Sequence, residues 1–337
     1  MNIVWFWTLA VMLAVYAALD GFDLGVGAVH LWVARANEER RVLLNAIGPV
    51  WNGNEVWLLA AGGMMVVAFP RVYASGFSGF YLALMLVLWL LILRGVSIEF
   101  RHQIDHPLWR ALWDAGFWLG SFLLAFLLGV ALGNVIQGLP IGQDGYFVGT
   151  FALLLNPYSL LTGLLSLVTL AWHGTNYLRL KTEDDLLSRA RQWSRWLFWV
   201  TAALVVVTTA ATFKARPDAT SNFSAHPWAI LFPLLAAAGL LGGLVFAGDP
   251  RDRLPFRMST LVITALLVTA GVTIFPDLLT STLNPAWSLT VYNAASAPRG
   301  LRDAFIANGL GMIGVVLYTT YARRAFRGKA RLGSHGY

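Results

Sequence analysis

The chain alternates between long apolar runs and short polar segments. Nine runs reach about 20 residues, the length that carries an α-helix across the hydrocarbon core of a bilayer. The runs are continuous rather than alternating, which favours helices over the strands of a membrane barrel. The sequence therefore predicts an all-α polytopic membrane protein with a single transmembrane domain, residues 1–337. Its helices are expected over residues 5–33, 46–69, 75–98, 113–137, 149–178, 193–213, 227–247, 258–280 and 301–322.

The polar segments between these runs differ in their content of lysine and arginine. Of the 24 basic residues, 19 follow the odd-numbered runs, counting the C-terminal tail, and 5 follow the even-numbered runs. Loops rich in lysine and arginine stay on the cytoplasmic side of a membrane. The distribution predicts an N-terminus outside the cell and a C-terminus in the cytoplasm.

Composition narrows the functional classes. Of 337 residues, 58% are hydrophobic and 12% are charged, which argues against a soluble globular protein. The absence of cysteine excludes disulfides and thiolate metal sites. The net charge of +7 arises from the loops, so no nucleic-acid partner is expected.

Two acids interrupt the first run, in the stretch ALDGFDLGVGAVHLWV. Asp20 and Asp23 are three residues apart, and His30 follows seven residues after Asp23. At 3.6 residues per turn, Asp23 and His30 are nearly eclipsed and Asp20 lies about 60° away. All three side chains can therefore share one face of the helix.

Further polar residues are expected at the same depth of the membrane. In the predicted topology, Asn52, Glu55, Arg94 and Asp114 belong, like Asp23 and His30, to the cytoplasmic half. Ionisable groups inside a membrane are rare and mark a pathway or a partner. The sequence thus predicts a polar cluster that opens towards the cytoplasm.

Two interpretations of this cluster stay open together. Loss of hydration makes a buried carboxyl take up a proton, and a nearby arginine opposes that effect, a combination that suits proton relay. Alternatively, Asp23 and Arg94 form a buried ion pair that fixes helix packing. In either case Asp20 is interpreted as a helix-contact or supporting group.

Structural roles are expected for the neighbouring small and aromatic residues. Gly21 and Gly25 have the spacing that lets membrane helices approach closely. Trp51 and Trp57 flank the polar positions of the second run. A nucleotide-binding loop is disfavoured because no strand precedes these glycines.

The histidines do not form a haem or metal motif. Only His30 and His173 fall within runs, and neither has a facing partner in the sequence. His102 and His106 have a metal-like spacing but lie in a basic loop, and His226 and His335 are isolated. No metal is expected in this chain.

Several ordered segments carry a family resemblance: DGFDLGVG, ERRVLLNAIGPVWNGNEVWLLAAGG, FPRVYASGFSGFYLALMLVLWLLILRGVSIEFR, LWDAGFWLGSFLLAFLLGVALGNVIQGLP, LLNPYSLLTGLLSLV and TAGVTIFPDLLTSTLNPAWSLTVYNAAS. Together they closely resemble subunit II of the cytochrome bd quinol oxidases. The resemblance implies two four-helix bundles plus one peripheral helix, paired with a similarly folded subunit I in the bacterial inner membrane. It also implies that subunit I carries haems b and d and that this chain is the haem-free partner.

The resemblance further implies an oxidoreductase that oxidises quinol, reduces dioxygen to water and takes its protons from the cytoplasm. A structural quinone, small single-span accessory subunits and membrane lipid are the other expected partners. Asp23 matches the second aspartate of the family's DGFD motif, Arg94 the arginine closing the third helix, and Trp51 the tryptophan of WDGN. The family has an acid at the next position, where this chain has Asn52. We therefore expect Glu55 to take the role of that acid. Alternatives are an ion-coupled secondary transporter and a partner whose acids serve assembly alone.

Overall fold

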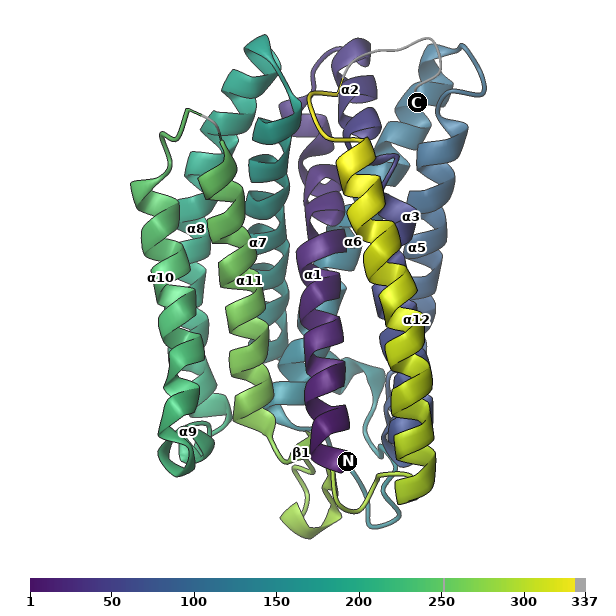
Figure 1. Cartoon of the computed structure of the whole chain (residues 1–337), viewed down its shortest axis with the longest axis vertical. Coiled ribbons are helices and arrows are strands. Elements are labelled where there is room, and N and C mark those ends of the chain that lie inside the picture. Colours follow the sequence, from purple (N-terminus) through teal and green to yellow (C-terminus); the bar gives the residue numbers. More distant parts are fainter. Residues whose placement is uncertain (251, 331–337) are drawn as a thin grey trace.

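The computed structural model describes residues 1–250 and 252–330, and within them almost every long segment is a helix (Figure 1). Arg251, Arg331 and His335, which entered the sequence analysis, lie outside the described residues. The long helices are α1 Asn2–Val33, α3 Trp51–Ala68, α4 Pro70–Gly79, α5 Tyr81–Phe100, α6 Pro107–Gln137, α7 Pro157–Lys181, α8 Asp184–Ala215, α10 Leu231–Val245, α11 Arg253–Ile274 and α12 Pro298–Ala325. The shorter elements are α2 Asn37–Ile47, α9 Ser221–Ala225, the 3₁₀ turns η1 Phe151–Leu155, η2 Pro227–Ile230 and η3 Pro285–Trp287, and the strands β1 Asp277–Leu279 and β2 Leu289–Thr290.

Seven of the described helices are long and apolar enough to cross a membrane: α1, α5, α6, α8, the η2–α10 segment, α11 and α12. The all-α polytopic fold class is confirmed. The count of nine is not, because α3 and α7 occupy two of the expected positions without being among the seven. In α3 the reason is visible in its first two turns, where Asn52, Asn54 and Glu55 lower its apolar character.

Several helix boundaries differ from the predicted ones for local reasons. The eighth predicted helix was expected to reach residue 280, but α11 ends at Ile274. Pro276, which has no N–H to donate, follows and precedes β1. The fifth helix begins at Pro157 rather than 149, because the Asn156 side chain accepts from the backbone N–H of Ser159 and caps it. The second segment is divided, with α2 ending at Ile47 and α3 starting at Trp51.

We call α1, α3, α5 and α6 the first helix group and α7, α8, α10 and α11 the second; α6 and α7 pack closely against each other where the groups meet. In the first group α1 contacts α3 and α6, and α5 contacts α6; in the second, α7 contacts α8 and α11, and α10 contacts α11. Helix α12, yellow in Figure 1, packs mainly against α3. Helix α1 joins the groups through α7 and α11, so its polar residues lie near the centre of the chain.

The contact between α1 and α7 depends on glycine. A Cβ added to Gly25 would lie 1.9 Å from the backbone oxygen of Leu170, and one added to Gly174 would lie 2.3 Å from the carbonyl carbon of Gly25. Gly21 also faces Leu170. Backbones this close leave no room for a side chain, as is common where membrane helices pack through small residues.

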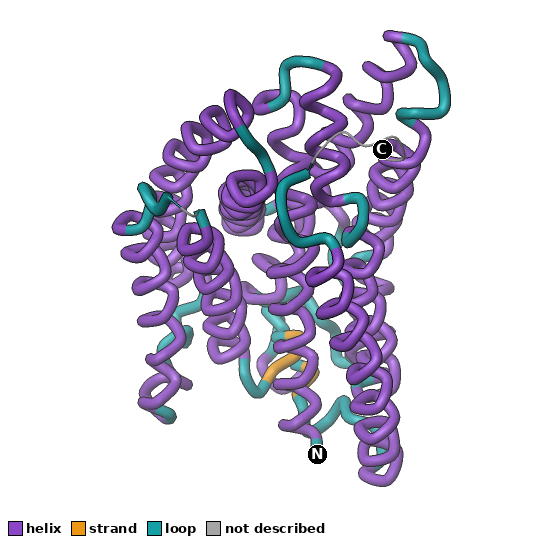
Figure 2. The backbone as a smooth tube through the Cα atoms, turned by 45° about the horizontal axis from the view of Figure 1, so that its top comes forward, coloured by secondary structure: helices purple, strands orange, loops and turns teal. Residues whose placement is uncertain are grey.

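Short strands and loops connect the groups at the end where the N-terminus lies (Figure 2). β1 and β2 pair antiparallel, and Leu139, just after α6, bridges to Ser281, just after β1. An apolar cluster that includes Trp5, Phe69 and Leu279 fills this end. The opposite end carries α2 and the loops in which most of the basic residues lie.

Candidate functional site

A buried guanidinium joins two acids from different helices. Arg94 of α5 is completely buried. Its Nη2 donates to Oδ1 of Asp20 on α1 over 2.9 Å, and its Nη1 donates to Oε1 of Glu55 on α3 over 2.8 Å. The Asp20 side chain is fully buried, whereas 22% of the Glu55 side chain is exposed. Of the two acids, Glu55 is thus the one that reaches the surface.

Asp23 lies beside this pair but has a different partner. Nδ2 of Asn54 donates to Oδ2 of Asp23 over 2.7 Å and to the backbone oxygen of Leu19 over 3.2 Å. Asp23 is completely buried, and its Oδ1 has no hydrogen-bond partner among the described residues. We call Asp20, Asp23, Asn54, Glu55 and Arg94 the Arg94 cluster.

Neighbouring helices shape the space around Arg94. Trp51, at the start of α3, lies with its ring centroid 5.9 Å from the guanidinium carbon, a cation–π distance. Gly120 of α6 lies against the Arg94 backbone, where an added Cβ would be 3.3 Å from the backbone nitrogen. The chain thus holds Arg94 by charge on one side and by close packing on the other.

A second set of ionisable residues lies nearer the α2 end. Asp114 of α6 accepts at Oδ1 from Nε of Arg101 over 2.6 Å and at Oδ2 from Nη1 of Arg40 over 3.0 Å. Nε2 of His30 lies 2.8 Å from Asp114 Oδ1. His30 is ten residues beyond Asp20, which on a helix is about 15 Å along the axis. We call His30, Arg40, Arg101 and Asp114 the Asp114 cluster.

The structure therefore divides the residues predicted to share one face. Asp20, Asp23, Glu55 and Arg94 come together, while His30 joins Asp114 instead. The predicted ion pair between Asp23 and Arg94 is wrong: among the described residues, Arg94 pairs with Asp20 and Glu55. The reason is the roughly 60° between Asp20 and Asp23, which directs one towards α5 and leaves the other to Asn54 of α3.

Helix α3 corrects one further expectation. Asn52 is exposed, whereas Asn54, two residues later, is buried and reaches Asp23. Trp51 and Trp57 are buried. Asn54 is three residues from each tryptophan, so it shares their inward face, while Asn52 points about 200° away from Asn54. That spacing was the available signal for Asn54.

Arg40 and Arg101 were also absent from the predicted site. Both look like ordinary basic loop residues in the sequence, and the positive-inside pattern accounts for them without a buried partner. Only the folded chain shows that the Arg101 side chain is 4% exposed and packed against Asp114. No sequence spacing relates these residues, since they belong to different segments.

The histidines inside the helices are already engaged. His173 has Nδ1 2.7 Å from Oγ of Ser259 and Nε2 3.1 Å from the backbone oxygen of Ala18. His30 uses Nε2 on Asp114, and His106 uses Nδ1 to accept from the N–H of Leu108 at the start of α6. The Nδ1 atom of His30 is buried and has no hydrogen-bond partner among the described residues.

Comparison with known proteins was informative over the whole chain. The profile of the family described as "Cytochrome bd terminal oxidase subunit II" matches residues 1–326. The chain is 34% identical to "Probable cytochrome oxidase subunit 2" of Haemophilus influenzae, covering 96% of this chain and 93% of that protein. It is 33% identical to "Cytochrome bd-I ubiquinol oxidase subunit 2" of Escherichia coli, covering 88% of this chain and 86% of that protein. A chain of the bd oxidase from Geobacillus thermodenitrificans has a similar fold, with a TM-score of 0.79 and 17% identity over 96% of this chain and 98% of that one.

Proposed function

This chain belongs to the cytochrome bd terminal oxidase subunit II family, and from this premise we propose that it is the haem-free subunit that delivers protons from the cytoplasm. It is a subunit of a quinol:oxygen oxidoreductase and a multi-pass protein of a bacterial inner membrane. Its enzymatic partner is subunit I, in which we place haems b and d. Water formation from dioxygen consumes protons, so a proton path is a chemical requirement of the complex.

The observation that carries the proposal is the composition of the Arg94 cluster. Three carboxyl groups lie together: Asp20 and Glu55 pair with Arg94, and the buried Asp23 accepts from Asn54 beside them. Uncompensated negative charge is expensive inside a membrane, so such a cluster favours holding a proton. Asp23 supports the role of carrier because its Oδ1 is not committed to any described partner.

Glu55 is the proposed point of access. Its side chain is the partly exposed member of the cluster and is 2.8 Å from Arg94, which also binds Asp20. Glu55 is thus joined to the buried Asp20 through Arg94, so a change in the charge of Glu55 acts directly on the buried part of the cluster. Asn52 is an amide and cannot exchange a proton, which leaves the role of the family's missing acid to Glu55.

The proposed direction of delivery follows from charge. The basic loops predict a cytoplasmic C-terminus, and α1 then runs from outside to inside. Glu55 lies four residues after the start of α3, about 6 Å along the helix from its cytoplasmic end. The Arg94 cluster then opens towards the cytoplasm, where protons are taken up.

We place subunit I against the face formed by α3 and α12. In the part of the chain that the structure describes, no atom lies within 4 Å of a Cβ added to any of five glycines: Gly62 and Gly63 of α3 and Gly309, Gly311 and Gly314 of α12. Exposed glycine within an apolar helix suits close packing of another membrane helix. Only 6% of the most apolar window of α12 is buried in this chain, which leaves most of that helix for a partner.

The test is Glu55→Gln in the complex purified with its haem-bearing partner. We expect slower quinol-driven oxygen consumption and slower proton uptake with an unchanged haem absorption spectrum. Glu38→Gln, on the exposed side of α2, is the matched control and should retain full turnover. Unchanged turnover in Glu55→Gln would favour the alternative in which the acids serve assembly alone.

A further inference from the structure

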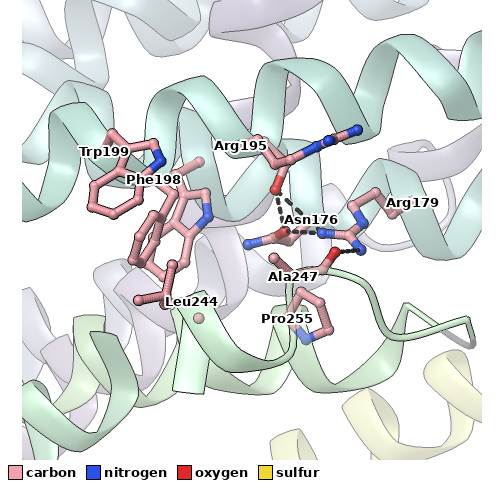
Figure 3. A pocket seen from close by; sticks show the side chains of 11 residues that line it. Asn176, Arg179, Arg195, Phe198, Trp199, Leu244, Ala247 and Pro255 are labelled. Carbon is pink, nitrogen blue, oxygen red and sulfur yellow. Dashed lines mark hydrogen bonds between the residues drawn. The ribbon is translucent and has the colours of Figure 1, made fainter. Parts of the chain in front are cut away.

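A small cavity lies at the cytoplasmic end of the second helix group, away from the Arg94 cluster (Figure 3). Its volume is about 100 Å³, and α7, α8, α10 and α11 contribute its walls. Trp172, Phe198 and Leu244 form an apolar side, and Asn176, Arg179 and Arg195 form a polar one. A volume of that size holds about three water molecules or a single compact polar group.

One wall carries an unused hydrogen-bond donor. Asn176 is completely buried, and its Oδ1 accepts from Oγ of Ser194 over 2.7 Å and from Nη1 of Arg179 over 3.5 Å. Its Nδ2 has no hydrogen-bond partner among the described residues. In Figure 3 this nitrogen points away from Arg179, towards Phe198 and Leu244. A buried N–H left without a partner loses its hydrogen bonds to water and gains none in return, so an acceptor is expected there.

The arginines around the cavity differ in how far they are neutralised. Arg179 donates from Nε to Asp252 over 2.8 Å and from Nη2 to the backbone oxygen of Ala247 over 2.8 Å. Asp252 also binds Arg191. Asp249 caps α11 by accepting from the N–H groups of Arg253 and Leu254. Three arginines line or adjoin the cavity against two aspartates, so the site favours an anion.

Arg195 is the free cation of the group. No carboxylate among the described residues lies within ion-pair distance of it, and its side chain is exposed. It also lines a shallow groove of about 580 Å³ on the outer face of α8, together with Trp196 and Trp199. Arg195 and Trp199 line both spaces, so the cavity and the outer groove adjoin each other.

The position of Arg195 along α8 indicates where the groove lies relative to the bilayer. Arg195 lies 20 residues before Ala215, the last residue of α8, which is about 30 Å along the helix and equals the hydrocarbon thickness of a bilayer. Trp196 is 58% exposed and Trp199 is 61% exposed. Exposed tryptophans at this level are typical of the membrane interface. Arg195 therefore sits at the height of lipid headgroups.

We propose that this cavity binds the phosphate group of an anionic phospholipid from the cytoplasmic leaflet. Asn176 Nδ2 donates to a phosphate oxygen, Arg195 supplies positive charge at the edge of the cavity, and the glycerol and acyl chains lie along the Trp196 and Trp199 groove. The apolar wall and the exposed tryptophans favour a lipid over free phosphate, because a free ion gains nothing from them. This site is separate from the proton path and does not depend on it.

The test uses the complete complex in detergent, titrated with phosphatidylglycerol and observed by native mass spectrometry. Arg195→Gln should weaken the tightest phosphatidylglycerol site about tenfold, since the positive charge at the edge of the cavity is lost. Asn176→Asp keeps the size and the acceptor oxygen but replaces the donor with a negative charge, and should abolish that site. Arg35→Gln, at an exposed arginine of the first helix group, is the matched control and should bind like the unaltered complex.

Three results would overturn the proposal. One is equal phosphatidylglycerol binding in Arg195→Gln and the unaltered complex, with the haem spectrum showing that both are folded. Another is equal affinity for phosphatidylcholine, which carries the same phosphate without net charge. The third is displacement of phosphatidylglycerol by millimolar inorganic phosphate, which would assign the site to a free ion.

Discussion

Arg94 Nη2 lies 2.9 Å from Asp20 Oδ1, and both side chains are completely buried. This contact gives the two aspartates of the first helix different tasks. Asp20 neutralises Arg94, while Asp23 keeps one oxygen without a described partner. The acid that looked like a supporting group is the charge partner, and its neighbour is the better candidate for a mobile proton.

Asp20→Asn should therefore lower the stability of the complex, whereas Asp23→Asn should lower its turnover. Removing one partner of a buried pair costs about 3–5 kcal/mol, so Asp20→Asn should lower the thermal midpoint and the yield of assembled complex. Asp23→Asn leaves Arg94 paired and should retain the haem spectrum while turnover falls at least about tenfold, equivalent to about 1.4 kcal/mol in the barrier. Thermal melts and oxygen uptake measured side by side separate the two, and identical profiles would contradict this division of tasks.

Asn52→Asp should rescue Glu55→Gln. The substitution restores an acid to the first turn of α3, three residues and about 60° from position 55. We expect oxygen uptake in the double variant to exceed that of Glu55→Gln alone, because a titratable group again faces the cytoplasmic side. Asn52→Gln in the same background is the control for a change at this position without a new acid. Equal turnover in the two double variants would remove the idea.

The Asp114 cluster should matter for stability. Asp114→Asn leaves Arg101 and Arg40 near each other without their carboxylate, and we expect a loss of about 3 kcal/mol or more. Asp105→Asn breaks a pair with Arg110, but the Asp105 side chain is 90% exposed, and surface pairs contribute about 0–1 kcal/mol. Thermal unfolding of the complex measures both, and similar shifts would show that burial is not the deciding factor.

Acid should weaken the contact between α2 and α8. Burial by itself would raise the pKa of Glu39, but the N–H groups of Arg35 and Ala36 and the guanidinium of Arg189 outweigh it and lower that pKa below its usual 4.5. The folded state then binds the proton less readily than the unfolded state. This contribution is fully present above pH 4.5 and disappears as pH falls through the folded-state pKa.

Glu39→Gln tests that sign. The variant should be less stable than the unaltered complex at neutral pH, and the difference between the two should shrink in acid. Thermal midpoints collected from neutral pH to below 4.5 would reveal it. Glu38→Gln should follow the unaltered complex throughout, and a constant difference for Glu39→Gln at every pH would contradict the assignment.

Gly25→Ala and Gly63→Leu should distinguish packing within the chain from packing against subunit I. The added Cβ at Gly25 would meet the backbone of Leu170 at 1.9 Å, and overpacking costs about 1–3 kcal/mol or more when backbone must move. We expect Gly25→Ala to reduce the amount of folded chain that can be recovered from the membrane.

Among the described residues, no atom lies within 4 Å of a Cβ added to Gly63. Gly63→Leu should leave the level of this chain unchanged and reduce the amount of haem-bearing subunit that co-purifies with it. Normal recovery of subunit I with Gly63→Leu would mean that another face makes the contact.

The sequence predicts the helices well because hydrophobic length is a local property, whereas their breaks depend on single residues. Two such breaks are the turn between α2 and α3 and the end of α11 before Pro276. Both depend on local chemistry that the average hydrophobicity of a window does not detect. The cluster was predicted in outline: residues on α1, α3 and α5 do meet. Their pairing was not, since whether Arg94 reaches Asp20 or Asp23 depends on the rotation of α1 against α5, which no single helix encodes.

The placement of α12 has a consequence for biogenesis. Ribosomes deliver this helix after the two groups that it joins, and it meets little of the chain described here when it arrives. The other long helices can pack against helices of the same chain. Most of the surface of α12 is turned away from the other helices, so under the proposed placement of subunit I this helix gains its main packing partner only when that subunit binds. In a cell that lacks subunit I, α12 would stay without this partner, and we expect membrane proteases to degrade the chain.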